Sequence, residues 1–141
     1  MRRWLLDTGP LVAYVDAGDP AHEIVATALD GFTGRLNTTG AVLTEAMHLV
    51  AADPSGSELL VEFLIASRAE IAETTRPVEL LAAVRLMRKY RDIPMDYADA
   101  TLVLLADQLG VTEILTLDLR GFSIYRTPRG KAFRLLLPRH R

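Results

Sequence analysis

The chain has 141 residues, half of them apolar and 24% charged, with a net charge of −2. These values are typical of one globular domain over residues 1–141, which is large enough to fold without disulfides. The absence of Cys excludes thiol nucleophiles and thiolate metal sites, and three His are too few for a structural zinc site. No apolar run is long enough to cross a membrane, and Asp7 interrupts the one that starts like a signal peptide. We therefore expect a soluble, cytoplasmic protein.

Strands and helices are predicted to alternate along the chain. Short apolar runs indicate strands, while helical spacing bounded by Pro and Gly indicates helices. In chain order we predict a strand at 3–7, a helix from 10 to about 16, a helix from 19 to about 30, a strand around 36, helices at 39–52 and 58–67, a strand at 69–73, helices at 77–90 and 94–110, and strands at 113–117 and 123–125. This alternation predicts an α/β fold with a central parallel sheet of about four to five short strands and helices on both faces.

Two aspartates directly follow predicted strands. Asp7 comes after an apolar strand at the amino terminus, and Asp118 comes after the strand at 113–117. In a parallel sheet, ligands bind beyond the carboxyl ends of the strands, where both side chains would emerge. Each aspartate could instead cap a helix or close a turn. Both residues are therefore candidates for a functional site as well as for local structure.

Three further acids lie within or at the start of predicted helices. Glu45 follows Val42 by three residues and precedes Leu49 by four, so we expect it to border the apolar stripe of its helix. A buried carboxylate is costly unless it is paired or binds a metal. Asp99 lies on the apolar face of its helix one turn after Asp96, and these two acids could also form a capping box.

These acids form an oxygen-only set of candidate metal ligands. Carboxylates without Cys or His favour a hard octahedral cation such as Mg²⁺ or Mn²⁺. Bringing several carboxylates together without a cation would be repulsive and would raise some of their pKa values. We therefore expect a divalent metal site.

Charge is distributed unevenly along the chain. Up to Asp118 there are 18 acids and nine Arg or Lys, whereas the remainder has no acid. Such a division suits a cation-binding pocket beside an edge that binds a polyanion, although a solvated tail would look the same. The seven bases after Asp118 are Arg120, Arg126, Arg129, Lys131, Arg134, Arg139 and Arg141.

The acids and their neighbours together resemble the PIN-domain ribonucleases, and more narrowly the VapC-type toxins of toxin–antitoxin pairs. The resemblance covers nearly the whole chain, and four acids in this order make it more specific than any one segment. The segments that carry it are Leu5-Leu6-Asp7-Thr8, Thr44-Glu45-Ala46, the run from Asp96 to Leu102, Thr116-Leu117-Asp118 followed by Phe122, Arg126-Thr127-Pro128-Arg129 and Ala132-Phe133.

The resemblance implies a PIN-like fold, metal-dependent cleavage of single-stranded RNA, a homodimer and neutralisation by a small antitoxin. By matching motif, Asp7, Asp99 and Asp118 would hold Mg²⁺ or Mn²⁺, and Glu45 would complete the acidic cluster and act on the attacking water. Asp96 would be an auxiliary acid. Cleavage would leave a 5′-phosphate and a 3′-hydroxyl. Residues with supporting roles are Thr8 and Thr116 beside the metal ligands, and Arg120, Arg126, Arg129 and Lys131 on the RNA.

Three other classes of protein share parts of this pattern. Asp7-Thr8-Gly9 is also the signature of retroviral-type aspartic proteases, but those are all-β and would not use the other acids. A receiver domain gathers acids at strand ends, but it needs a Lys after a later strand, and neither Lys89 nor Lys131 is suitably placed. A catalytically inactive PIN-like module that binds RNA or protein remains the main alternative.

Overall fold

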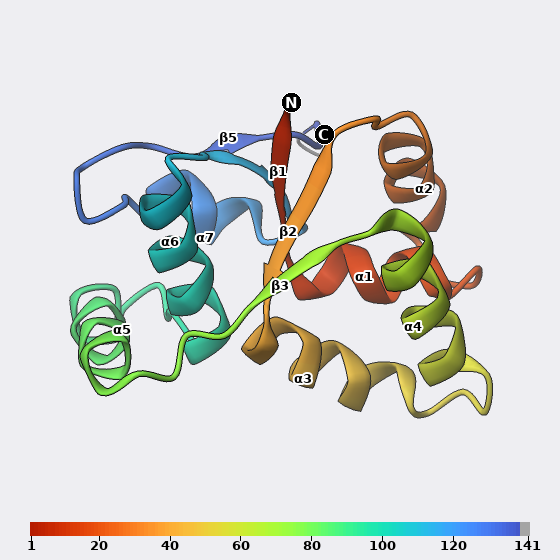
Figure 1. Ribbon diagram of the computed structural model, residues 1–141, viewed down its shortest axis with the longest axis horizontal. Coiled ribbons are helices and arrows are strands. Elements are labelled where there is room, and N and C mark those ends of the chain that lie inside the picture. Colours follow the sequence, from red (N-terminus) through yellow and green to blue (C-terminus); the bar gives the residue numbers. More distant parts are fainter. Residues whose placement is uncertain (139–141) are drawn as a thin grey trace.

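Five parallel strands form the centre of the protein in the order β3-β2-β1-β4-β5 (Figure 1). The computed structural model describes residues 1–138, so two of the seven bases that follow Asp118, Arg139 and Arg141, lie outside the described part. This sheet confirms the predicted α/β fold. The strands are β1 (Arg3–Leu6), β2 (Arg35–Thr39), β3 (Glu70–Ala72), β4 (Glu113–Leu115) and β5 (Arg134–Leu135).

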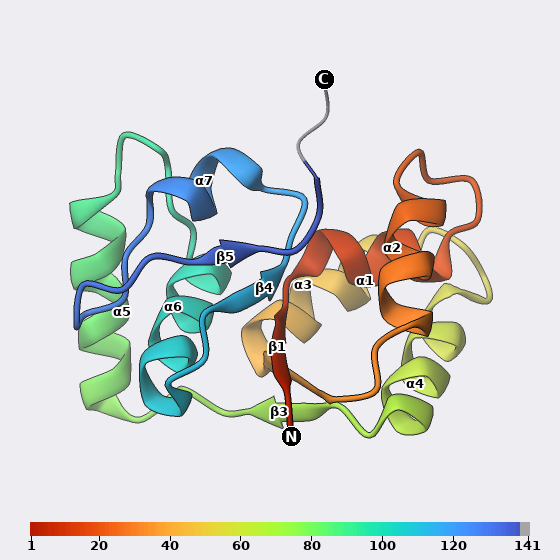
Figure 2. The same cartoon turned by 90° about the horizontal axis from the view of Figure 1, so that it is seen from above.

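Helices cover both sides of this sheet. Figures 1 and 2 show α1, α2 and α4 on one side and α5, α6 and α7 on the other, while α3 lies near the carboxyl end of β2. Among the described residues, no helix is long and apolar enough to cross a membrane. The helices are α1 (Thr8–Val15), α2 (His22–Asp30), α3 (Gly40–Val50), α4 (Gly56–Ser67), α5 (Pro77–Lys89), α6 (Tyr97–Leu109) and α7 (Leu119–Ile124).

The connections between strands create a switch point beside β1. From β1 the chain adds β2 and β3 on one side, and it then crosses to place β4 and β5 on the other. The ladder between β1 and β4 ends where the Asp7 amide donates to the Leu115 carbonyl at 3.1 Å. Open α/β sheets bind ligands between two neighbouring parallel strands whose following connections run to opposite sides of the sheet. Asp7 lies at this position.

The prediction of a strand over 123–125 is wrong. Residues 119–124 form α7, and the fifth strand is β5, with Arg134 paired to Glu113 in its register. Asp118 caps α7 by accepting a hydrogen bond from the Gly121 amide at 3.0 Å. A one-turn capping contact therefore decides the conformation of this segment, although its residues alternate as they would in a strand.

Candidate active site at the carboxyl end of the sheet

Asp7 is held rigidly at the end of β1. The side chain is 7% exposed, and it caps α1 by accepting from the Thr8 amide at 2.8 Å through Oδ1. Its other oxygen, Oδ2, accepts from the buried Thr116 hydroxyl at 2.7 Å. The Thr116 oxygen in turn accepts from the Asp118 amide at 2.9 Å. A chain of hydrogen bonds therefore links the ends of β1 and β4.

The start of α6 carries the second pair of acids. Asp96 accepts from the Asp99 amide at 2.8 Å, and Asp99 accepts in return from the Asp96 amide at 3.2 Å through Oδ2. The capping box that the sequence allowed is thus present. Behind it, the buried Thr101 hydroxyl lies 2.8 Å from that of Thr39, which fixes α6 against the end of β2. Asp99 is half-buried, while Asp96 is exposed.

Four aspartates influence one another at this end of the sheet. Burial raises the pKa of Asp7 to about 6, with smaller contributions from the carboxylates of Asp118 and Asp96, although the Thr116 and Thr8 hydrogen bonds lower it. Burial also raises the pKa of Asp99, and the charges on Asp96, Asp7 and Asp118 raise it further. The residues Asp7, Asp96, Asp99 and Asp118 therefore form one acidic cluster.

The donor set of the acidic cluster fits a hard divalent cation. Its ligands are all oxygen, and the Oδ1 of Asp99 and the Oδ2 of Asp118 make no hydrogen bond among the described residues. A cation would also remove the repulsion that raises the pKa values of Asp7 and Asp99. Within residues 1–138, no three acidic or His side chains already converge into a coordination shell.

Glu45 does not lie where its spacing predicted. The buried positions of α3 are Val42, Ala46 and Val50, so the apolar stripe passes beside Glu45 and leaves it exposed. Leu49, which defined the predicted stripe, is 50% exposed. Within the described residues, the Glu45 side chain makes no hydrogen bond or ion pair, so the prediction that it borders the core is wrong.

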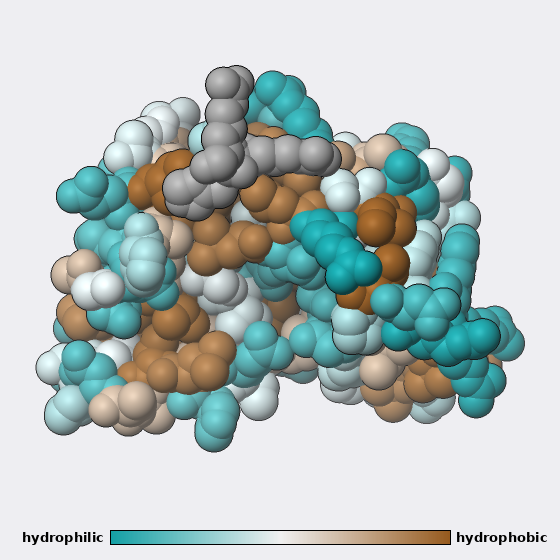
Figure 3. Space-filling model, turned by 180° about the vertical axis from the view of Figure 1, so that it is seen from behind, coloured by the Kyte–Doolittle hydropathy of each residue, from teal (hydrophilic) through white to brown (hydrophobic). Residues whose placement is uncertain are grey.

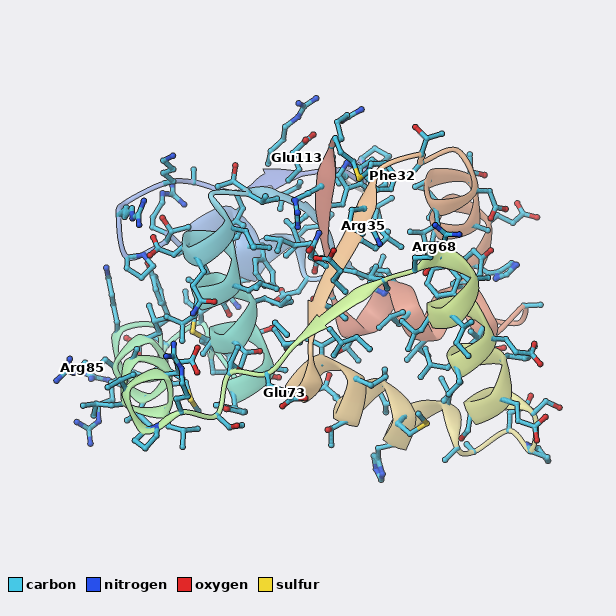
Figure 4. All side chains as sticks on the ribbon, viewed as in Figure 1. Phe32, Arg35, Arg68, Glu73, Arg85 and Glu113 are labelled. Atoms are coloured by element: carbon cyan, nitrogen blue, oxygen red, sulfur yellow. The ribbon has the colours of Figure 1, made fainter. Side chains whose placement is uncertain are left out.

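A different glutamate lies against the start of α3. Glu73 follows β3, and Figure 4 shows it at the end of α3 nearest the sheet. A Cβ atom added at Gly40 would lie 2.8 Å from its Oε1. Glu73 is not among the site residues predicted from the sequence.

Two of the four predicted RNA-binding residues are engaged within the protein. Arg126 donates through Nη1 to the carbonyls of residues 123, 124 and 125, at 2.9–3.1 Å. Arg129 lies 3.7 Å from Asp107 in an exposed ion pair. Arg120 and Lys131 are exposed, and their side chains have no ion-pair partner in the described part of the chain.

One aromatic side chain that the sequence analysis did not select also faces the acidic cluster. The Tyr125 side chain is fully buried, and its hydroxyl has no hydrogen-bond partner among the described residues. Tyr125 is seven residues after Asp118, which is the same face of a helix but the opposite face of a strand. Because the sequence predicts a strand over 123–125, it offers no reason to expect Tyr125 and Asp118 on the same face.

Comparison with known proteins gives a relative over nearly the whole sequence. No protein-family model matches the chain. Ribonuclease VapC26 of Mycobacterium tuberculosis is 35% identical over 133 residues, which cover 94% of this chain and 98% of that protein.

A solved structure is similar in fold. It is that of Mycobacterium tuberculosis VapC20, described as a toxin that cleaves the sarcin–ricin loop. It superposes with a TM-score of 0.68 over 80% of this chain and 87% of that one, at 17% identity. The fold and the sequence relative agree with the resemblance found from the motifs. The protein therefore belongs to the VapC family of ribonucleases.

Proposed function

We propose that the protein is a toxin endoribonuclease that cleaves RNA with the help of Mg²⁺ or Mn²⁺ held by Asp7, Asp99 and Asp118. The observation that carries this proposal is the crowding of carboxylates at the switch point of the sheet, where burial and mutual repulsion raise the pKa values of Asp7 and Asp99. Carboxylates held at such a cost are typical of functional sites. Family membership supplies RNA as the substrate class.

The chain's own groups would prepare this site for a phosphodiester. Thr116 and the Thr8 amide fix both oxygens of Asp7, so its carboxylate needs little reorganisation. The amino terminus of α1 is directed at the same place, and the dipole of a helix favours an anion there. A divalent cation, when bound, supplies a Lewis acid for a phosphate oxygen and lowers the pKa of water. The motif resemblance alone assigns Glu45, which is exposed on α3, to orienting or deprotonating the attacking water.

Arg120 and Lys131 are the best placed of the predicted residues to attract RNA. Both are exposed without an ion-pair partner in the described part, and Arg120 follows Asp118 by two residues. Phosphate contacts would give an affinity that falls with salt and depends little on base sequence. We expect Arg120→Ala with Lys131→Ala to weaken RNA binding and flatten its salt dependence. Arg129→Ala is the matched control, because that side chain already pairs with Asp107.

Two separate apolar surfaces support a homodimer and an antitoxin as partners. One is the outward face of α5, whose apolar residues are Val78, Leu80, Leu81 and Val84, flanked by Arg85, which points away from the body in Figure 4. The other is a groove of about 440 Å³ between α3 and α4, lined by residues that include Leu43, Met47, Val61, Leu64, Ile65 and Ile71.

The shapes of these surfaces suggest how they are used. A convex helical face suits contact with a second copy, whereas a groove accepts a narrow segment of a small antitoxin. On the reverse side of the molecule, Figure 3 also shows brown hydrophobic patches separated by hydrophilic side chains. Exposed apolar area of this kind is typical of association surfaces.

The function is tested by incubating purified protein with RNA and mapping the cut ends. We expect cleavage with Mn²⁺, 5′-phosphate and 3′-hydroxyl ends, no cleavage with EDTA, and none by Asp99→Asn. Asp96→Asn is a control that keeps a good N-cap at the start of the same helix. RNA binding without cleavage in Mn²⁺ would instead support the inactive binding module. Undiminished cleavage in EDTA would contradict the metal.

A further inference from the structure

A buried hydroxyl without a partner lies beside the acidic cluster. The Tyr125 side chain is 0% exposed, and its oxygen makes no hydrogen bond among the described residues. Burial raises the pKa of Tyr125, and the charges of the nearby carboxylates of Asp99, Asp118 and Asp96 raise it further. Leaving a buried donor unpaired is costly, and such a group calls for an explanation.

The helix α7 explains how this hydroxyl reaches the cluster. Asp118 caps the start of α7 and Tyr125 caps its end, seven residues later and therefore on the same face. Long side chains on a helix point back toward its amino terminus, so the Tyr125 ring extends toward Asp118. Gly121 lies between them, and a Cβ atom added there would clash with the Asp118 Oδ2 and lie 2.9 Å from the Tyr125 hydroxyl. Both oxygens thus meet over the one position of α7 that carries no side chain.

The Tyr125 ring is held firmly in this orientation. It packs edge-on against Tyr90 and Phe122, each with a centroid distance of 5.1 Å. Its backbone is fixed as well, because its amide donates to the Gly121 carbonyl at 2.9 Å and its own carbonyl accepts from Arg126 at 2.9 Å. The hydroxyl is therefore presented to the acids by a rigid support.

We propose that Tyr125 is a positioning residue of the acidic cluster, whose hydroxyl lies between the carboxylates of Asp99 and Asp118 and shares its one proton with both, which fixes them relative to each other. The Oδ1 of Asp118 already accepts from the Gly121 amide, so the hydroxyl serves the other oxygen, Oδ2, which lies beside it over Gly121. Such donors orient metal-ligating carboxylates and tune their affinity. The inference rests on the proposed metal site, and it adds a residue that the motif resemblance does not assign.

The test measures Mn²⁺ affinity by calorimetry on the full chain, with RNA cleavage as a second measurement. Tyr125→Phe keeps the ring and removes only the hydroxyl. We expect it to weaken Mn²⁺ binding about tenfold to a hundredfold and to lower kcat for RNA by a similar factor without changing KM. The metal-free variant should keep its fold, since the ring and its contacts with Tyr90 and Phe122 remain.

Two further variants sharpen this test. Tyr14→Phe is the matched control, because its hydroxyl donates to Asp30 at 2.8 Å, away from the acidic cluster, and it should bind Mn²⁺ like the wild type. Gly121→Ala should weaken Mn²⁺ binding with the Tyr125 hydroxyl still present, because its methyl group would force the two oxygens apart. If Tyr125→Phe does not fold, the Mn²⁺ affinity of Gly121→Ala tests the role of Tyr125 in its place.

The outcomes separate this inference from the proposed function. If the wild type binds Mn²⁺ and Asp99→Asn does not, the metal site is supported. In that case, equal Mn²⁺ affinity of Tyr125→Phe and the wild type would overturn the role of Tyr125 alone. If Tyr125→Phe does not fold, unchanged Mn²⁺ affinity in Gly121→Ala overturns it. If the wild type binds no Mn²⁺, the metal site and the role of Tyr125 fall together.

Discussion

Replacing Asp7 by Asn is expected to abolish RNA cleavage while stabilising the metal-free protein. Asn keeps the volume of the side chain and caps a helix as well as Asp does. It can still accept from the Thr8 amide, which contacts only one oxygen of Asp7. What it removes is a buried negative charge beside Asp118 and Asp96, together with the Oδ2 that accepts from Thr116, whose hydroxyl oxygen can accept from the new amide instead.

The size of the stabilisation follows from the pKa of Asp7. It rises from 3.8 to about 6 on folding, and each step of one in pKa corresponds to about 1.4 kcal/mol. Ionisation of Asp7 therefore costs the metal-free protein about 3 kcal/mol at pH 7. Because the folded-state pKa is the higher one, the folded protein holds its proton where the unfolded chain has lost it. The contribution of Asp7 to the free energy of unfolding therefore falls as the pH rises from about 4 to about 6.

Denaturation with urea in EDTA, from pH 4 to pH 8, measures this cost directly. Asp7→Asn and the wild type should be about equally stable near pH 4, and the variant should gain up to about 3 kcal/mol above pH 6. The corresponding rise in Tm is about 10 °C. A constant difference in the free energy of unfolding across this range would refute the argument, because it would mean that the charge of Asp7 is not the source of the cost.

Three other predictions follow from the same geometry. Asp99→Asn should lower the cleavage rate at least a hundredfold, and Asp96→Asn should lower it less than tenfold. The reason is that Asp96 is exposed, whereas Asp99 is half-buried beside Asp7. Equal losses in rate assays on the two variants would contradict this. Mn²⁺ should raise the Tm of the wild type where NaCl of equal ionic strength does not, since metal binds only the folded arrangement. Leu81→Glu should convert the proposed homodimer to a monomer in sedimentation experiments, and a wild type that is already monomeric at micromolar concentration would contradict the role of α5.

The parallel sheet and the position of Asp7 could be predicted from sequence because local and long-range signals agree there. An apolar run ends at Asp7, and the next residues cap a helix, so strand, turn and helix each have their own signal. The same holds at Asp96, where a capping box starts α6. These signals act over a few residues, which is the range that a single sequence shows.

The exposure of Glu45 and the conformation around Tyr125 could not be predicted in this way. Spacing of three and four residues is compatible with more than one face of α3, and packing selected the face of Val42 and Ala46. The segment before Tyr125 alternates like a strand, yet it becomes α7 because Asp118 caps it and the strand pairing is taken by residues further along. In both cases tertiary contacts decide between local alternatives of similar energy.

The capping roles of the aspartates explain how this small protein can hold several charges at one place. Asp7, Asp96 and Asp118 each cap a helix, and Asp99 accepts from the backbone in the capping box, so one oxygen of each is fixed by an amide. A capped carboxylate cannot rotate away from its neighbours, which sustains the repulsion that raises the pKa values of Asp7 and Asp99. These acids can therefore act both as structural caps and as metal ligands, because capping uses one oxygen of each carboxylate. The other oxygen keeps a lone pair for a cation, even in Asp7, where it also accepts from Thr116. It follows that Asn substitutions separate the two roles, since they keep the cap and remove the charge, whereas Ala substitutions remove both.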